Sequence, residues 1–500
     1  MGIAHSHVDP FFRRNLMRNV LPSLFLTLAA VGLSSATGCH TDLQFTGDLG
    51  VVSGGAQDIG YARQVIEEGG VPAADSITVG GLLNEHDLPL NVDGCEDVLC
   101  MDGAAGTGWV ESEGSDSVFL QLGYDTALSA DSFQREDQNL IAVIDISGSM
   151  SGELEDIRFA LHALLDQLSG RDALGVVVYG SQGEILLDLT QANNSNLADI
   201  ERRIDALESG GSTNMEEGLQ LGFRMARDAS EANGRQTRVM LFTDVQPNAG
   251  STSAGTFGSF IREGADDDIG FTLFGIGDQF GFELAQQISE FPLSNYFFLD
   301  SSESIRDCFD TLDLMVTPIA RDVHIEASTA AGFDLIEAYN IVAAEGEGPM
   351  IEAVIPTLFL SENSGASIFR IGAPEGIRPM IGSTIATLSL SYEDLLLEPG
   401  SFKETQVSVR MSDQAGGYHD DTFGHSSVRK SAVLVNAALS MMDLCAAYHE
   451  GFVIDALDSF DETVERLASE AESLDDADLH TEVVLLNKLR ANVLDGQHLD

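Results

Sequence analysis

Five carboxylate and hydroxyl side chains follow predicted strands, or precede a predicted helix, at three separate places in this 500-residue chain. They are Asp145, Ser147, Ser149, Thr213 and Asp244. Hard oxygen ligands of this kind suit octahedral Mg²⁺ or Mn²⁺, or Ca²⁺, whereas Zn²⁺ prefers His and Cys. The residue types therefore predict a divalent-cation site, provided that the fold brings the three places together.

A largely parallel sheet would bring them to one edge. Short apolar runs predict buried strands, and stretches between them with apolar residues three or four apart predict helices. The strands are expected at 140–145, 173–179, 238–244, 270–275 and 296–299. The run 184–189 follows a tight Gly180 to Gly183 turn, so it predicts an antiparallel edge strand. Ligands of such α/β sheets bind at the carboxyl ends of the strands, where all three places lie.

The pattern Asp145-x-Ser147-x-Ser149, with Thr213 and Asp244, resembles the complete metal-ion-dependent adhesion site of von Willebrand factor type A domains. The resemblance implies that the three hydroxyls bind the metal directly and that the carboxylates often act through water. It also implies one open coordination position for an acidic residue of a partner protein. Val245 stands where the family commonly has glycine.

The whole chain is expected to be α/β, with a doubly wound, Rossmann-like type A domain at 136–318. Residues 40–135 precede it, and their segment 61–89 looks like the N-terminal segment of bacterial exported type A domain proteins. Strand patterns between Gly, Pro and acidic turns predict a β-sandwich-like domain at 319–426. Apolar residues three and four apart predict a helical segment at 427–500.

The N-terminus has the pattern of a secretory signal. Arg13, Arg14 and Arg18 precede an apolar run at 20–33, and small residues lead into Cys39. This ending resembles the lipobox of bacterial lipoproteins, so residues 1–39 are expected to be a signal peptide with a lipobox-like end, in which Cys39 becomes the lipidated first residue of the mature chain. The alternative is an ordinary secretory signal whose cleavage site lies beside a cysteine. The first interpretation predicts a lipid-anchored protein of the bacterial cell envelope, at the outer membrane, with no later segment that spans a membrane.

The chain is strongly acidic, with 80 Asp and Glu against 25 Lys and Arg and a formal net charge of −55. Phosphate backbones would be repelled, so we expect no nucleic-acid partner. The charge fits either a salt-adapted protein or a generally acidic secreted one.

In an oxidising setting Cys95 and Cys100 are expected to form a disulfide, whereas Cys308 and Cys445 are expected to be buried thiols.

Several other activities fit poorly. A serine hydrolase is a further alternative, because residues 148–152 look like a nucleophile elbow and His324, His419, His425 and His449 lie downstream, but Met150 stands at the centre of the motif. The Gly275-x-Gly277 pair lacks dinucleotide-binding spacing, and no HExxH motif supports a zinc protease.

The expected function is therefore non-enzymatic: a surface-anchored adhesion module that binds an acidic residue of a protein ligand through the cation. The alternatives are an accessory subunit of an envelope or secretion assembly, and an ion that only holds the three loops together.

Overall fold

The structure is a computed structural model and describes residues 49–90, 92, 94–110, 114–130, 133–277, 280–341, 343–345, 349–372, 380–411 and 422–497. The predicted signal sequence and Cys39 lie outside the described residues. The free thiols are Cys445, which is buried, and Cys308, which is half-buried. Cys95 and Cys100 are joined by a disulfide.

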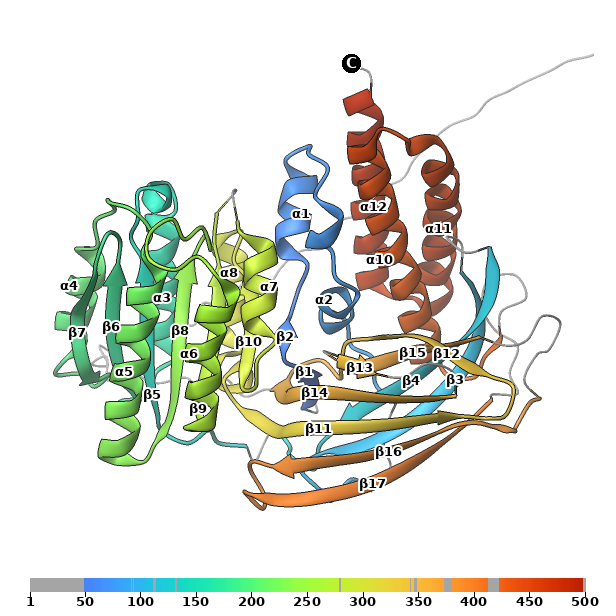
Figure 1. Cartoon of the computed structure of the whole chain (residues 1–500), viewed down its shortest axis with the longest axis horizontal. Coiled ribbons are helices and arrows are strands. Elements are labelled where there is room, and N and C mark those ends of the chain that lie inside the picture. Colours follow the sequence, from blue (N-terminus) through green and yellow to red (C-terminus); the bar gives the residue numbers. More distant parts are fainter. Residues whose placement is uncertain are drawn as a thin grey trace, which may run out of the picture. The chain divides into compact units, whose positions relative to one another are not determined.

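The α/β domain is built on one sheet with the strand order β2-β10-β9-β8-β5-β6-β7 (Figure 1). Neighbouring strands are parallel except β6 and β7, which form the predicted antiparallel edge. The strands are β2 (Gly55–Ala56), β5 (Gln138–Asp145), β6 (Ala173–Tyr179), β7 (Gly183–Gln191), β8 (Gln236–Thr243), β9 (Ile269–Gly275) and β10 (Ser294–Phe298).

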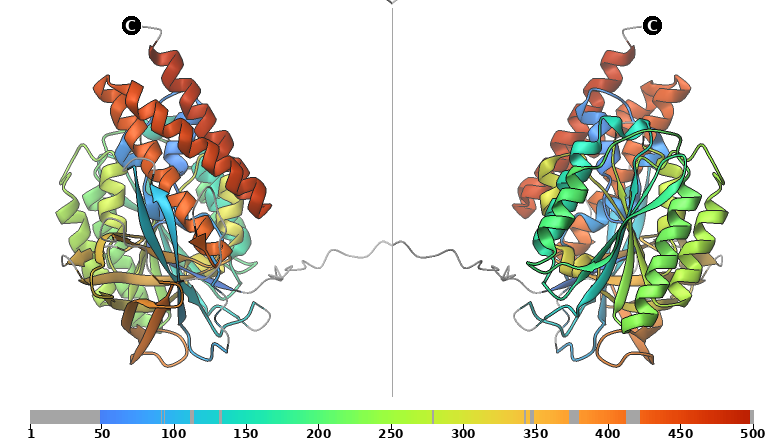
Figure 2. Two further views of the ribbon diagram at one scale, coloured as in Figure 1. Left: turned by 90° about the vertical axis from the view of Figure 1, so that its right-hand side faces the viewer. Right: turned by 90° about the vertical axis from the view of Figure 1, so that its left-hand side faces the viewer.

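Helices cover both faces of this sheet, as the right-hand view of Figure 2 shows. One face packs against α3 (Leu154–Gln167), α4 (Leu197–Asp205), α8 (Ser302–Asp310) and α9 (Leu312–Met315). The other packs against α5 (Met215–Asn233), α6 (Ala254–Asp266) and α7 (Phe282–Ser289). Successive side chains of a strand point to opposite faces, so β5 sends Leu140, Ala142 and Ile144 to the first face and Ile141 and Val143 to the second.

The β-rich part consists of two sheets that share one apolar core, which confirms the predicted sandwich. The first sheet contains β1 (Gly50–Ser53), β11 (Pro318–Thr329), β13 (Ala343–Glu345), β14 (Met350–Ser361), β16 (Thr384–Asp394) and β17 (Ser401–Arg410). The second contains β3 (Cys100–Val110), β4 (Ser115–Asp125), β12 (Asp334–Tyr339), β15 (Ala366–Gly372) and β18 (Thr422–Phe423).

Two long strands of the second sheet come from the region before residue 136, which is expected from the sequence to be a separate segment. Strands β3 and β4 form a hairpin, and β4 pairs with β15, so this region belongs to the sandwich. The pattern of β3 is hard to recognise because it is rich in glycine. At Gly106 a Cβ atom would lie 2.1 Å from the Phe423 ring, so the aromatic side chain of β18 fills the space of the missing side chain.

Helices α10 (Ser426–Glu450), α11 (Val453–Leu474) and α12 (Ala477–Gln497) confirm the helical C-terminal segment. They share a core with α1 (Gly60–Glu67) and α2 (Val79–Asn84). Contrary to the expectation from the sequence, α10 is long and apolar enough to span a membrane by length and composition. However, 67% of its apolar window is buried inside the protein, which accounts for this composition.

Candidate metal site

The first loop of the site begins where β5 ends. Asp145 is buried, and its Oδ1 accepts a 2.9 Å hydrogen bond from the backbone N–H of Ser147. The hydroxyls of Ser147 and Ser149 lie 3.0 Å apart. Ser149 is exposed and opens the short 3-10 helix Ser149–Ser151, whereas Ser147 is buried. Two hydroxyls and one carboxylate are thus gathered within five residues.

Backbone hydrogen bonds join the second loop to the first. The N–H of Gly210 donates to the carbonyl of Ile146 at 2.7 Å, and the N–H of Gly148 donates to the carbonyl of Gly211 at 3.1 Å. Gly211 has a φ of +96°, which glycine adopts without strain. These bonds fix the loop that carries Thr213, whose side chain is buried.

Asn248 joins the third loop to the second. Its Oδ1 accepts a 2.9 Å hydrogen bond from the N–H of Thr213, and its Nδ2 donates to Thr213 Oγ1 at 3.3 Å. Its own N–H donates to the carbonyl of Thr213. At the start of the same loop, Asp244 is buried and its Oδ1 accepts from the N–H of Gln246 at 3.1 Å.

The negative charge of Asp244 acts on the buried carboxylate of Asp145. Burial raises the pKa of Asp145, and the negative charge of Asp244 raises it further, while hydrogen bonds from Ser147 and Thr243 oppose the shift. The Tyr179 hydroxyl is also buried, beside Asp145, and has no hydrogen-bond partner of good geometry in the described part of the chain. A bound cation would offset the cost of burying two carboxylates, so these residues fit a divalent ion.

The donor set consists of hydroxyl and carboxylate oxygens, which suits Mg²⁺, Mn²⁺ or Ca²⁺. Within the described residues, no group of three or more His, Cys, Asp or Glu side chains is arranged to hold a metal ion. The hydroxyl-rich set is therefore the candidate metal site among the described residues.

Val245, directly after Asp244, has a φ of +53° and is buried. A β-branched residue in the left-handed region is strained, and this is where the resemblance leads us to expect glycine. Val245 thus adopts a backbone conformation that glycine would adopt without strain. Gly281 makes room for the backbone at Val245, because a Cβ atom at position 281 would lie only 2.1 Å from the Val245 carbonyl oxygen.

Three residues around the site are not predicted by the sequence analysis: Tyr179, Thr243 and Asn248. Tyr179 and Thr243 are the last residues of β6 and β8, the two strands on either side of β5. Polar residues at the ends of apolar strands were the available signal for both. Asn248 had no comparable signal, because its role depends on the path of a loop.

The histidines weighed for a hydrolase lie on other elements, as far as the structure describes them. His324 is on β11, His425 caps the start of α10, and His449 lies near the end of α10, 3.0 Å from the carbonyl oxygen of Pro72. His419 lies outside the described residues. No described histidine is hydrogen-bonded to Ser149, so the geometry of a serine nucleophile has no support.

Comparisons with known proteins bear on the fold that carries this candidate site. Residues 140–246 match the von Willebrand factor type A domain family. An uncharacterized protein of Escherichia coli, YfbK, is 28% identical over 189 residues, which cover 37% of this chain and 32% of the relative. The uncharacterized protein sll0103 of Synechocystis is 35% identical over 126 residues, 25% of this chain and 29% of the relative. The matched regions thus span less than a third of these relatives.

Among solved structures, a von Willebrand factor type A protein from Catenulispora acidiphila superposes with a TM-score of 0.50 at 14% sequence identity. The match covers 77% of this chain and 89% of that one. At this identity the likeness concerns the fold. Residues 140–246 are thus similar to the von Willebrand factor type A domain family, and the chain shares the fold of a solved type A protein.

Proposed function

We propose that this protein is a non-enzymatic binding module that holds one divalent cation, Mg²⁺ or a related ion, at the candidate metal site. Its ligands are Asp145, Ser147, Ser149, Thr213 and Asp244, directly or through water. The cation, when bound, supplies an electrophilic centre for an acidic residue of a partner protein. The chain's own residues hold the three loops in place and keep the carboxylates buried.

The observation that carries this proposal is the arrangement of Ser147 and Ser149. Their hydroxyls lie 3.0 Å apart, and the buried carboxylate of Asp145 is already engaged by the backbone of the same loop. Ser149 is exposed, so a ligand held there remains within reach of a partner. A purely structural ion would not need an exposed ligand.

We further propose that the protein acts in the bacterial cell envelope, anchored through a lipid on Cys39. This part rests on the N-terminal sequence alone. A lipid anchor would hold the binding module at a membrane surface without a spanning helix.

Affinity capture tests the proposed binding mode. Wild-type protein, Asp145→Ala and Asp188→Ala are used as bait with envelope extract, each in Mg²⁺ and in EDTA. Asp188 is an exposed carboxylate on β7, so its substitution removes the same charge away from the site. Wild type and Asp188→Ala should retain a common partner in Mg²⁺ and lose it in EDTA. Recovery of the same partner with Asp145→Ala, or in EDTA, would exclude the metal-bridged mechanism.

A further inference from the structure

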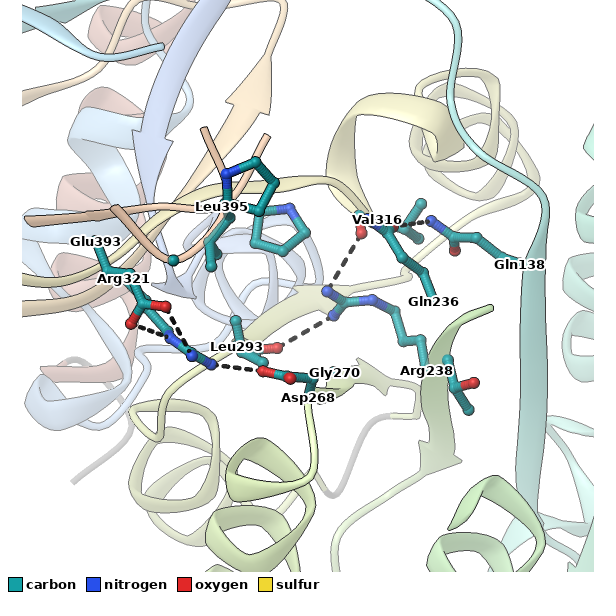
Figure 3. A pocket seen from close by; sticks show the side chains of 14 residues that line it. Gln138, Gln236, Arg238, Asp268, Gly270, Leu293, Val316, Arg321, Glu393 and Leu395 are labelled. Atoms are coloured by element: carbon teal, nitrogen blue, oxygen red, sulfur yellow. Dashed lines mark hydrogen bonds and ion pairs between the residues drawn. The ribbon is translucent and has the colours of Figure 1, made fainter. Parts of the chain in front are cut away.

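A pocket of about 320 Å³ lies at the amino ends of β8 and β9. This is the edge of the sheet opposite the candidate metal site. The end of β16 and the turn that follows it close the other side. Much of the lining is apolar and comes from Leu293, Val316, Pro318, Leu395 and Pro399. Figure 3 shows the guanidinium of Arg238 between Leu293 and Val316, with Leu395 across from it.

Arg238 is only 3% exposed, and its guanidinium contacts neutral acceptors. Nη1 donates to the carbonyl of Phe271 at 2.9 Å, to Thr272 Oγ1 at 3.0 Å and to the carbonyl of Leu293 at 3.3 Å. Nη2 donates to the carbonyl of Val316 at 3.3 Å. Burial lowers the pKa of Arg238 to about 9, and no neighbouring acid opposes that shift.

The fold makes room for this side chain. At Gly270 a Cβ atom would lie 2.6 Å from the guanidinium carbon of Arg238, so only glycine allows the guanidinium to lie across β9. The Phe359 ring lies 5.4 Å from the same carbon, a cation–π distance. The guanidinium is thus held in place by its surroundings rather than by a counter-ion.

Two other arginines with little exposed side chain have carboxylate partners. Arg370, which is fully buried, pairs with Glu337 at 2.8 Å, and Arg135 pairs with Asp172 at 3.0 Å. A buried charge is costly unless it is paired, and this chain has more than three acidic residues for each basic one. Arg238 has no ion-pair partner in the part of the chain that the structure describes, although acidic side chains are abundant.

The pocket also contains a buried acceptor without a partner. Oε1 of Gln138 accepts no hydrogen bond from the described residues, while its Nε2 donates to Oε1 of Gln236 at 3.2 Å. Gln138 is 1% exposed and lines the same pocket. A buried amide oxygen normally has a donor, so its partner is expected to come from a ligand.

We propose that this pocket binds a small organic monocarboxylate that also carries a hydrogen-bond donor. The carboxylate pairs with Arg238, the donor reaches Gln138, and the apolar body lies against Leu395 and its apolar neighbours. A dianion such as phosphate fits less well. The other lining cation, Arg321, is already paired with Glu393 at 2.8 Å and Asp268 at 2.7 Å, and these carboxylates would repel a second negative charge.

Isothermal titration calorimetry with mandelate as the probe tests this assignment. Mandelate has a carboxylate, a hydroxyl and an apolar ring. Wild-type protein should bind one molecule per chain. Mandelamide, which lacks the charge, should bind at least about tenfold more weakly, because a charge-assisted hydrogen bond is lost. Phenylacetate, which lacks the hydroxyl, should bind a few-fold more weakly. Equal affinity for mandelate and mandelamide, or no saturable binding of mandelate at about 10 mM, would overturn the proposal.

Matched variants locate the binding. Arg238→Met should abolish mandelate binding, whereas Arg171→Met, which removes an exposed arginine, should leave it unchanged. Because Arg238→Met removes buried hydrogen bonds and can unfold the protein, Leu395→Trp is the second variant. It fills the pocket, retains Arg238 and should also abolish binding. Unchanged affinity in a folded Leu395→Trp variant would show that mandelate binds elsewhere and would contradict the proposal.

Discussion

The hydroxyl of Thr243 donates a 2.8 Å hydrogen bond to Oδ2 of Asp145. These two residues end the neighbouring parallel strands β8 and β5. Because Oδ1 of Asp145 accepts from the N–H of Ser147, both carboxylate oxygens are engaged and the carboxylate has a fixed orientation. The geometry of the candidate metal site therefore depends on the pairing of two central strands as well as on its loops.

Substitution of Thr243 tests this dependence. Thr243→Val keeps the shape of the side chain but removes the hydrogen bond to Asp145, so Mg²⁺ affinity should fall about 10- to 100-fold, as for other residues that orient metal ligands. Thr243→Ser should restore most of the affinity. Calorimetric titration of Mg²⁺ measures the change. Equal affinities of Thr243→Val and wild type would show that Thr243 does not orient Asp145.

The strained conformation of Val245 leads to a prediction about stability. At a buried valine with regular backbone, such as Val239 in β8, substitution by Gly should cost about 1 kcal/mol more than substitution by Ala. At Val245, with its φ of +53°, that difference should vanish, because glycine adopts positive φ without strain. Denaturant unfolding of the four variants gives the comparison. The same Ala-to-Gly cost at both positions would argue against strain at Val245.

The α/β domain was predictable because its strands are buried on both faces and read as continuous apolar runs, such as residues 140–145. The strands β3 and β4 were not predictable from the sequence, because β3 is rich in glycine. The space beside Gly106 is filled by the ring of Phe423, which lies about 300 residues away in the sequence. The spacing of apolar residues over 303–314 predicts one helix there, but the chain forms two, α8 and α9, which are separated at Thr311. Within the candidate site, Asp145, Ser147 and Ser149 are recognisable from their local spacing, whereas the position of Asn248 depends on tertiary structure.

Asp58 should make stability depend on pH. Its Oδ2 accepts from the N–H of Phe298 at 3.0 Å, and its Oδ1 accepts from the N–H of Gly60 at 2.8 Å. Burial, reinforced by the charge of Glu85, raises its pKa to about 7. Between the unfolded value near 3.8 and this folded value, the folded state binds the proton and the unfolded state does not. Stability should therefore fall as pH rises through this window, by at most about 4 kcal/mol.

The variant Asp58→Asn isolates this contribution, because the remaining carboxylates titrate in both proteins. The stability advantage of wild type over Asp58→Asn should decrease from pH 4.5 to pH 8. The substitution Asp188→Asn serves as the control, because Asp188 is exposed. The difference in stability between wild type and Asp188→Asn should change little over this pH range. Unfolding free energies from denaturant titrations at each pH provide the data. A constant difference between wild type and Asp58→Asn would mean that Asp58 is not protonated in this range.

Lipidation of Cys39 is testable in cells. A radioactive fatty acid should label the wild-type chain but not Cys39→Ser, since the thiol is the attachment point. Cys445→Ser is the matched control, because it removes a buried thiol of the helical segment. Labelling of Cys39→Ser to the same extent, or no labelling of wild type, would favour an ordinary secretory signal.

The central claim is that the three loops hold one divalent cation, and calorimetric titration of Mg²⁺ into the purified protein tests it most directly. Wild type and the surface control Asp188→Ala should each bind one ion per chain. Asp145→Ala and Asp244→Ala should show only weak, diffuse association of Mg²⁺ with the acidic surface, because each removes a buried carboxylate of the site. Unchanged one-to-one binding in both of these variants would contradict the assignment of the site.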